Sequence, residues 1–128
     1  MVKLLSLIGL GGALGSILRY LLSVWLQPDR TSFPVGTLMV NVMGCLAIGV
    51  VGTILYGPTS AARPDLRAFV IVGVLGGFTT FSSFGRETIN LVGDHQYGYA
   101  AAYVLLSNVL GLGAVWLGVR VTEHFYGA

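Results

Sequence analysis

The stretch at 76–90 reads GGFTTFSSFGRETIN, and it directly follows the apolar run AFVIVGVL at 68–75. Apolar character continues to Phe78, but this run would reach only about 16 Å as a helix, roughly half of a hydrocarbon core of about 30 Å. Its two glycines then supply backbone freedom, and Thr79 and Thr80 carry hydroxyls that compete for backbone hydrogen bonds. The sequence therefore predicts a membrane helix that is interrupted near the middle of the bilayer.

The rest of the chain has the composition of an integral membrane protein. Of its 128 residues, 55% are hydrophobic and only 9% are charged, whereas about one quarter of a soluble domain is charged. Four apolar runs are each long enough to cross a bilayer, and they predict helices at about 4–26, 35–56, 66–92 and 99–121. We expect an all-α transmembrane domain over residues 1–128. Its surroundings are the lipid bilayer rather than a nucleic acid.

Four spans place both termini on one side of the membrane. Lys and Arg residues near the span ends normally set the orientation of a membrane protein, and this chain has few of them. Insertion in both orientations therefore stays open. Four helices also enclose very little interior. A lone chain could hardly bury Arg19, Asn41, Glu87 and Asn108 together and still leave room for a pathway. We therefore expect a homodimer.

Two phenylalanines follow the predicted break at helical spacing. Phe81 and Phe84 stand three apart, with Ser82 and Ser83 between them. Core packing explains such spacing in most proteins. The hydroxyls favour another interpretation here, because a ring edge carries the positive part of the aromatic quadrupole and faces a small anion well while hydroxyls donate to that anion. Asn41 in the second span would add amide donors.

The charges within the spans favour an anion over a cation. Arg19 and Arg86 are positive charges away from the ends of the spans, whereas a cation path calls for rings of carboxylates and only Glu87 is available. Glu87 could relay protons as an intramembrane carboxylate, although the neighbouring Arg86 favours a structural ion pair. A small multidrug exporter needs an acidic residue deep in the first span, which has none.

Two classes without transport fit less well. A scaffold would leave the polar residues of TTFSSF at 79–84 without a purpose, despite their cost in lipid. An intramembrane enzyme would need a base beside Ser82 or Ser83, whereas His95 lies in the connector after this span. A transport protein is therefore the better interpretation.

Three segments resemble the signatures of the fluoride channel family known as Fluc or CrcB. They are GGALGSILRY at 11–20, GTLMVNVMG at 36–44 and GVLGGFTTFSSFGRE at 73–87. The resemblance implies a dual-topology homodimer of antiparallel subunits with two pores. It further implies a channel, not an enzyme, that passively exports fluoride across the inner membrane of a bacterium to relieve fluoride toxicity. A proton-coupled fluoride exchanger and a small dual-topology multidrug exporter stay as alternatives.

The resemblance also implies roles for individual residues. Phe81 and Phe84 correspond to the ring pair whose edges line the fluoride path, and Asn41 corresponds to the asparagine that donates to the ion. The backbone carbonyls of Gly76 and Thr79 correspond to those that bind a structural Na⁺ at the dimer centre. The other pathway positions are the vestibule arginine Arg19, the hydroxyl track of Ser82, Ser83, Tyr103 and Ser107, and the buried glutamate Glu87.

Overall fold

The computed structural model describes residues 1–27, 33–57 and 64–126. Throughout these residues the regular structure is helical, and four helical segments are long and apolar enough to span a membrane. This confirms the predicted all-α membrane architecture. The helices are α1 (Val2–Leu26), α2 (Val35–Tyr56), α3 (Pro64–Arg67), the π-helix η1 (Ala68–Leu75), α4 (Gly76–Phe78), α5 (Phe81–Gly93) and α6 (Tyr97–Tyr126).

The last helix is longer than its apolar run. It begins at Tyr97 and ends at Tyr126, whereas the sequence predicts 99–121. Helical hydrogen bonding continues through the polar residues near the C-terminus, where Arg120 Nη1 lies 3.2 Å from Glu123 Oε2. An ion pair at this spacing stabilises the helix end modestly.

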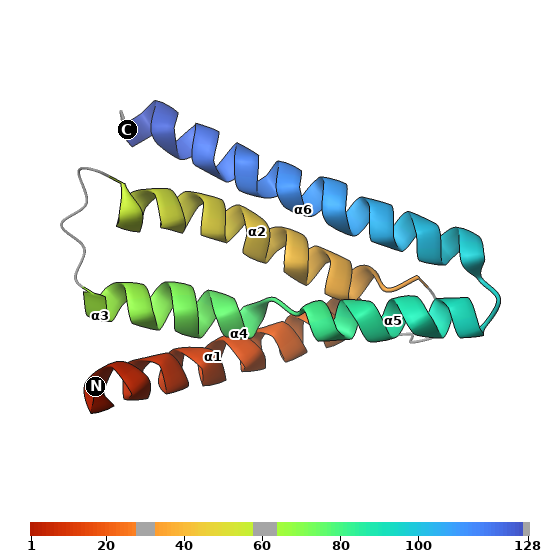
Figure 1. The fold of residues 1–128 in the computed structure, drawn as a ribbon, viewed down its shortest axis with the longest axis horizontal. Helices are drawn as coiled ribbons and strands as arrows, with labels where there is room; N and C mark the ends of the chain where they lie inside the picture. The colour runs from red at the N-terminus through yellow and green to blue at the C-terminus, as the bar shows by residue number, and fades with distance from the viewer. Residues whose placement is uncertain (28–32, 58–63, 127–128) are drawn as a thin grey trace.

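The helices lie side by side as an elongated bundle, with both termini at the same end (Figure 1). Helix α1 packs mainly on η1 and α4, and α2 packs mainly on α6. Helix α5 continues the direction of α4 beyond a short irregular link and contacts α6. The end of α1 also holds the start of α2, because Gln27 Oε1 accepts a hydrogen bond from Gly36 N at 3.1 Å. Such a bond satisfies an amide at the helix N-terminus.

Glycines allow the backbones of α1 and η1 to come into direct contact. A Cβ on Gly11 would stand 2.5 Å from Phe69 O, and a Cβ on Gly73 would stand 2.9 Å from the Cα of Gly11. Neither position has room for a side chain, so small residues create this contact as in other membrane helix pairs. The π-helical turns of η1 were not predicted from the sequence. A π segment within a helix often marks a functional site.

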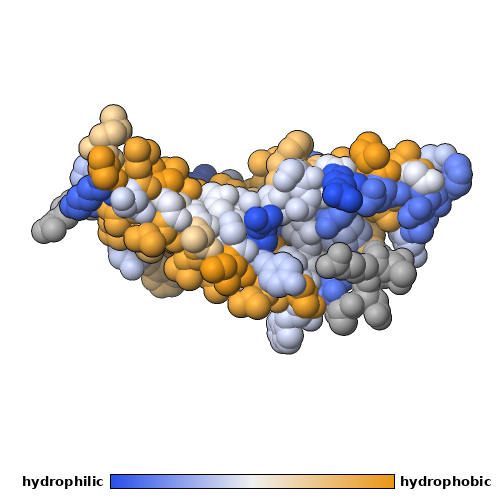
Figure 2. All heavy atoms as spheres, turned by 90° about the horizontal axis from the view of Figure 1, so that it is seen from below, coloured by the Kyte–Doolittle hydropathy of each residue, from blue (hydrophilic) through white to orange (hydrophobic). Residues whose placement is uncertain are grey.

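Little of the side-chain surface is buried in one chain. Tyr103 and Val40 are the largest fully buried side chains of the described residues. Apolar residues cover much of the face in Figure 2, while polar residues gather towards the half of the molecule that holds α5. This half contains the site described below.

Candidate functional site

The site is centred on the link between α4 and α5. Thr79 (φ −83°, ψ 156°) and Thr80 (φ −150°, ψ 116°) have extended backbones, so the helical run from Pro64 stops at Phe78 and starts again at Phe81. A helix interrupted in this way leaves amides and carbonyls without their usual partners. Their hydrogen bonds therefore show what holds the link in place.

Asn41 on α2 clamps the link from both sides. Its Nδ2 donates to Thr80 O at 2.9 Å, and its Oδ1 accepts from Thr80 N at 2.8 Å. One asparagine side chain thus replaces the helical acceptor of Thr80 N and gives Thr80 O a side-chain donor. The amide nitrogen keeps a second hydrogen, since Nδ2 carries two and the bond to Thr80 uses one.

Thr80 also starts the next helix. Its Oγ1 accepts from Ser83 N at 3.2 Å, which is the bond of an N-cap residue, and it lies 3.1 Å from Ser83 Oγ and 3.2 Å from Ser82 Oγ. Hydroxyl groups of three neighbouring residues therefore meet at the start of α5. Threonine is a favoured N-cap for this reason.

These bonds divert two amides from the carbonyls they would serve in a continuous helix. Thr80 N would donate to Gly76 O, and Ser83 N would donate to Thr79 O, because α-helical bonds run four residues back. Instead, these amides bind Asn41 Oδ1 and Thr80 Oγ1. The carbonyls of Gly76 and Thr79 have lost their helical donors.

The carbonyl of Gly77, which lies between Gly76 and Thr79 in the sequence, is hydrogen-bonded by side chains of α1. Gly77 O accepts from Arg19 Nε at 3.2 Å and lies 3.4 Å from Ser16 Oγ. Arg19 is therefore both a positive charge beside the link and a partner of its backbone. Ser16 is a contact that the sequence did not predict.

Three aromatic rings run from the link towards α6. The centroids of Phe81 and Phe84 are 5.4 Å apart, and those of Phe84 and Tyr103 are 5.2 Å apart. Phe84 is half-buried, whereas 82% of the surface of Phe81 is exposed in one chain. The two phenylalanines share a helical face as their spacing predicts, and Phe81 projects away from the core.

Glu87 binds two hydroxyls from different helices. Thr37 Oγ1 donates to its Oε1 at 2.7 Å, and Tyr103 Oη donates to its Oε2 at 2.6 Å. The predicted ion pair between Arg86 and Glu87 is wrong, since no contact between them falls within 4.0 Å. Consecutive residues on a helix do not face each other, which explains the difference. Thr37 lies one helical turn before Asn41, so the two side chains share a face of α2. This spacing could have indicated from the sequence that Thr37 belongs to the site.

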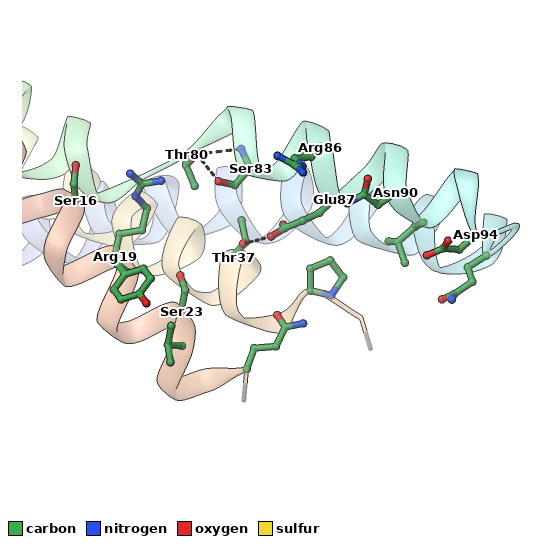
Figure 3. Close-up of a pocket in the computed structure, with 16 residues that line it drawn as sticks. Ser16, Arg19, Ser23, Thr37, Thr80, Ser83, Arg86, Glu87, Asn90 and Asp94 are labelled. Atoms are coloured by element: carbon green, nitrogen blue, oxygen red, sulfur yellow. Dashed lines mark hydrogen bonds between the residues drawn. The ribbon is translucent and has the colours of Figure 1, made fainter. Parts of the chain in front are cut away.

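A cleft of about 810 Å³ opens beside the link (Figure 3). It brings together three of the predicted pathway residues, Arg19, Ser83 and Glu87, and it adds Thr37, Thr80 and Arg86. The cleft does not include the other predicted positions. Ser82 and Phe81 are exposed outside it, and Tyr103 and Ser107 lie on α6, where Ser107 Oγ is buried without a described hydrogen-bond partner.

This geometry defines a class of protein. The described chain is a multi-pass membrane protein with a polar cleft, an interrupted helix and aromatic rings at the interruption. Within the described ranges no group of three His, Cys, Asp or Glu residues could hold a metal ion. The chain belongs to the CrcB family: the model for "CrcB-like protein, Camphor Resistance (CrcB)" matches residues 6–119.

Curated relatives resemble the chain along nearly all of its length. A protein of Helicobacter pylori (strain G27) is 43% identical over 92% of both chains. One of Helicobacter acinonychis (strain Sheeba) is 43% identical over 91% of this chain and 92% of its own. One of Chlorobium chlorochromatii (strain CaD3) is 42% identical over 88% of this chain and 87% of its own. Each of them is named "Fluoride-specific ion channel FluC".

Proposed function

We infer that this chain is a fluoride-specific ion channel of the membrane. The observation that carries this function is the identity of 42–43% with relatives of that name, which extends over about nine tenths of the chain. Four spans and a polar cleft between them are consistent with ion transport, and the curated relatives are named as channels.

The chemistry of the site suits a small anion. Fluoride holds its water tightly, so a path for it needs closely spaced donors that replace this shell, together with a narrow passage that larger halides cannot enter as favourably. The link supplies the hydroxyls of Thr80, Ser82 and Ser83 and the second amide hydrogen of Asn41. Phe81 stands between Thr80 and Ser82 in the sequence, and the edge of its aromatic ring carries partial positive charge.

We propose a pathway that starts in the cleft and passes the two rings. Arg19 attracts fluoride into the cleft, Asn41 and the serines at 82 and 83 donate to it, and the edges of Phe81 and Phe84 flank it. Tyr103 and Ser107 line the far end, and Glu87 lies between the cleft and Tyr103, to which it is hydrogen-bonded. Two features support this order: the ring series from Phe81 to Tyr103, and the buried Ser107 hydroxyl without a described partner.

The functional unit of this proposal is an antiparallel homodimer with two pores. A pathway residue cannot face lipid, but Phe81 is 82% exposed on one chain and Gly76 is exposed too. A second copy placed over this face would bury both. The proposal puts the break near the bilayer midplane, where irregular backbone is tolerated only if protein or water covers it.

A structural Na⁺ at the dimer centre fits the carbonyls of this link. Gly76 O and Thr79 O have lost their helical donors to Asn41 and Thr80. Carbonyls of unwound membrane helices are suitable ligands for Na⁺. Two copies would supply four such oxygens, and the bound cation would offset their mutual repulsion and attract an anion.

The channel would work passively in the inner membrane of a bacterium and export fluoride from the cytoplasm. The organisms of the relatives support this location. Both insertion orientations are needed for an antiparallel pair. Labelling Lys3 from either side of the membrane tests this, and a fixed single orientation would contradict it.

Fluoride efflux from liposomes that contain the purified protein tests the function. We expect fast efflux without a proton gradient, little response to chloride, and loss of efflux in Phe81→Ile and Phe84→Ile. Efflux that requires a proton gradient would favour an exchanger with Glu87 as the proton carrier. Transport of toxic cations would favour a multidrug exporter instead.

Replacement of Na⁺ by N-methylglucamine in detergent tests the cation site. We expect the dimer to become less stable, because a ligand that binds only the assembled state stabilises it by mass action. Unchanged dimer stability over a wide range of Na⁺ concentration would contradict the site.

A further inference from the structure

We propose that Arg86 is an electrostatic guide for anions in the cleft, and that it raises the rate at which fluoride reaches the pathway. This inference rests on the proposed channel function. It adds a second guanidinium to that of Arg19, whose Nε is already bound to the backbone of the link. Three observations support it: the place of Arg86, its lack of a described counter-ion, and the order of charges along the cleft.

Arg86 lies on α5 and lines the same cleft as Arg19 and Ser83. Figure 3 shows Arg19 at the end of the cleft near the link, Arg86 further along α5 and Asp94 at the opposite end. An anion that enters the cleft and moves towards Ser83 therefore passes Arg86.

The charge of Arg86 is not neutralised by a described neighbour. Among residues 1–27, 33–57 and 64–126, no carboxylate lies within 4.0 Å of its guanidinium. Lys3 pairs with Asp65 and Arg120 pairs with Glu123. The guanidinium of Arg86 is exposed and keeps its donors for a ligand.

The two acidic groups of the cleft do not cancel this charge at the pathway. Glu87 directs its carboxylate to Thr37 and Tyr103, away from Arg86 (Figure 3). Asp94 lies two helical turns beyond Arg86, at the end of α5. The half of the cleft next to the link therefore has two guanidinium groups facing one hydroxyl-bound carboxylate.

Charges in a concave site raise the local concentration of the opposite ion and speed its entry. For one charge a few ångström from the ion path, this corresponds to about two- to tenfold in rate at low ionic strength. The effect must disappear in salt, because the Debye length falls from about 30 Å at 0.01 M to about 3 Å at 1 M.

The test compares Arg86→Gln with wild type in liposome efflux at limiting fluoride, with an impermeant salt at about 0.01 M and about 1 M. We expect Arg86→Gln to be about two- to tenfold slower at low salt and equal to wild type at high salt. Arg86→Lys should restore the rate, since it keeps the charge. Arg120→Gln is the matched control, because it removes the same charge far from the cleft and should change nothing.

Asn90→Asp gives a second test that keeps the Arg86 side chain but places a carboxylate one helical turn from it, where it would pair with the guanidinium. Asn90 lines the cleft and is exposed, so a negative charge there should slow efflux with the same salt dependence. Equal rates of Arg86→Gln and wild type at low salt would overturn the inference. A deficit of the same size at both salt concentrations, not restored by lysine, would overturn it as well. If wild type itself passes no fluoride, the channel function fails rather than the role of Arg86.

Discussion

Replacement of Asn41 by alanine should loosen the link between α4 and α5. The change removes two hydrogen bonds, from Asn41 Nδ2 to Thr80 O at 2.9 Å and from Thr80 N to Asn41 Oδ1 at 2.8 Å. Thr80 N would be left unpaired, which costs about 1–3 kcal/mol in a poorly hydrated site, whereas Thr80 O keeps the helical bond that an N-cap carbonyl accepts. The cleft lets some water reach Thr80, so we expect a loss in the lower half of that range, about 1–2 kcal/mol.

Asn108→Ala is the matched control for this change. Asn108 is exposed, and its Nδ2 donates to Val104 O within its own helix at 2.7 Å. That carbonyl sits in the interior of α6, where backbone bonding already serves it, so its loss should cost no more than about 0.5 kcal/mol. Comparison of the two Asn→Ala variants thus distinguishes the stabilising bonds of Asn41 to Thr80 from the dispensable bond of Asn108 to Val104.

Reversible unfolding in mixed detergent micelles measures both variants. Hydrogen exchange of the Thr80 amide gives a local measurement, and it should speed up in Asn41→Ala and stay unchanged in Asn108→Ala. Equal stability of the two variants, together with an unchanged Thr80 amide, would refute the assignment of the link to Asn41.

The remaining predictions concern the rings, the Glu87 network and the helix contact. Phe84→Ile should destabilise the fold by about 1–2 kcal/mol, because it removes the ring contact with Tyr103 at 5.2 Å, whereas the exposed Phe81→Ile should leave the stability of a single chain nearly unchanged. Fluoride efflux should fail in both. Tyr103→Phe leaves Glu87 with one hydroxyl donor and should cost about 1–3 kcal/mol in detergent unfolding; an unchanged midpoint would rule out the bond as a stabilising contact. Gly15→Ala places a methyl group against Val74 O and should prevent close packing of α1, while Gly9→Ala, with nothing within 4 Å, should be tolerated. Expression and gel-filtration profiles compare these two, and equal profiles would contradict the backbone contact.

The spans could be predicted because apolar length is a strong signal in a chain with few charges. Thr79 and Thr80 also gave a usable signal, since hydroxyls after paired glycines compete for backbone bonds, and the structure has extended backbone at both residues. Helix ends were less predictable. The polar residues at 120 and 122–124 continue α6, because helical hydrogen bonding does not require apolar side chains.

Contacts between distant residues could not be predicted from spacing alone. Asn41 and Thr80 are 39 positions apart, and their pairing depends on how α2 crosses the link. The hydroxyls on Glu87 come from Thr37 and Tyr103 on two other helices. Adjacency in sequence suggested Arg86 as the partner of Glu87 and was misleading, since neighbouring helical residues diverge.

The π-helical turns of η1 had no signal in its composition. The run at 68–75 is as apolar as an ordinary span, and its widened turns coincide with the close contact between Gly11 and Gly73. The π-helical geometry of η1 therefore depends on how α1 packs against it, and the apolar content of the run does not predict this packing.

The link between α4 and α5 is held by two different helices. Ser16 and Arg19 of α1 bind Gly77 O, whereas Asn41 of α2 binds Thr80. The separation of the carbonyls at 76 and 79 therefore depends on the tilt between α1 and α2. Membrane helices adjust their tilt to bilayer thickness. Lipid chain length should consequently act as a mechanical control on this protein, and cation affinity should differ between thin and thick bilayers of otherwise identical headgroups.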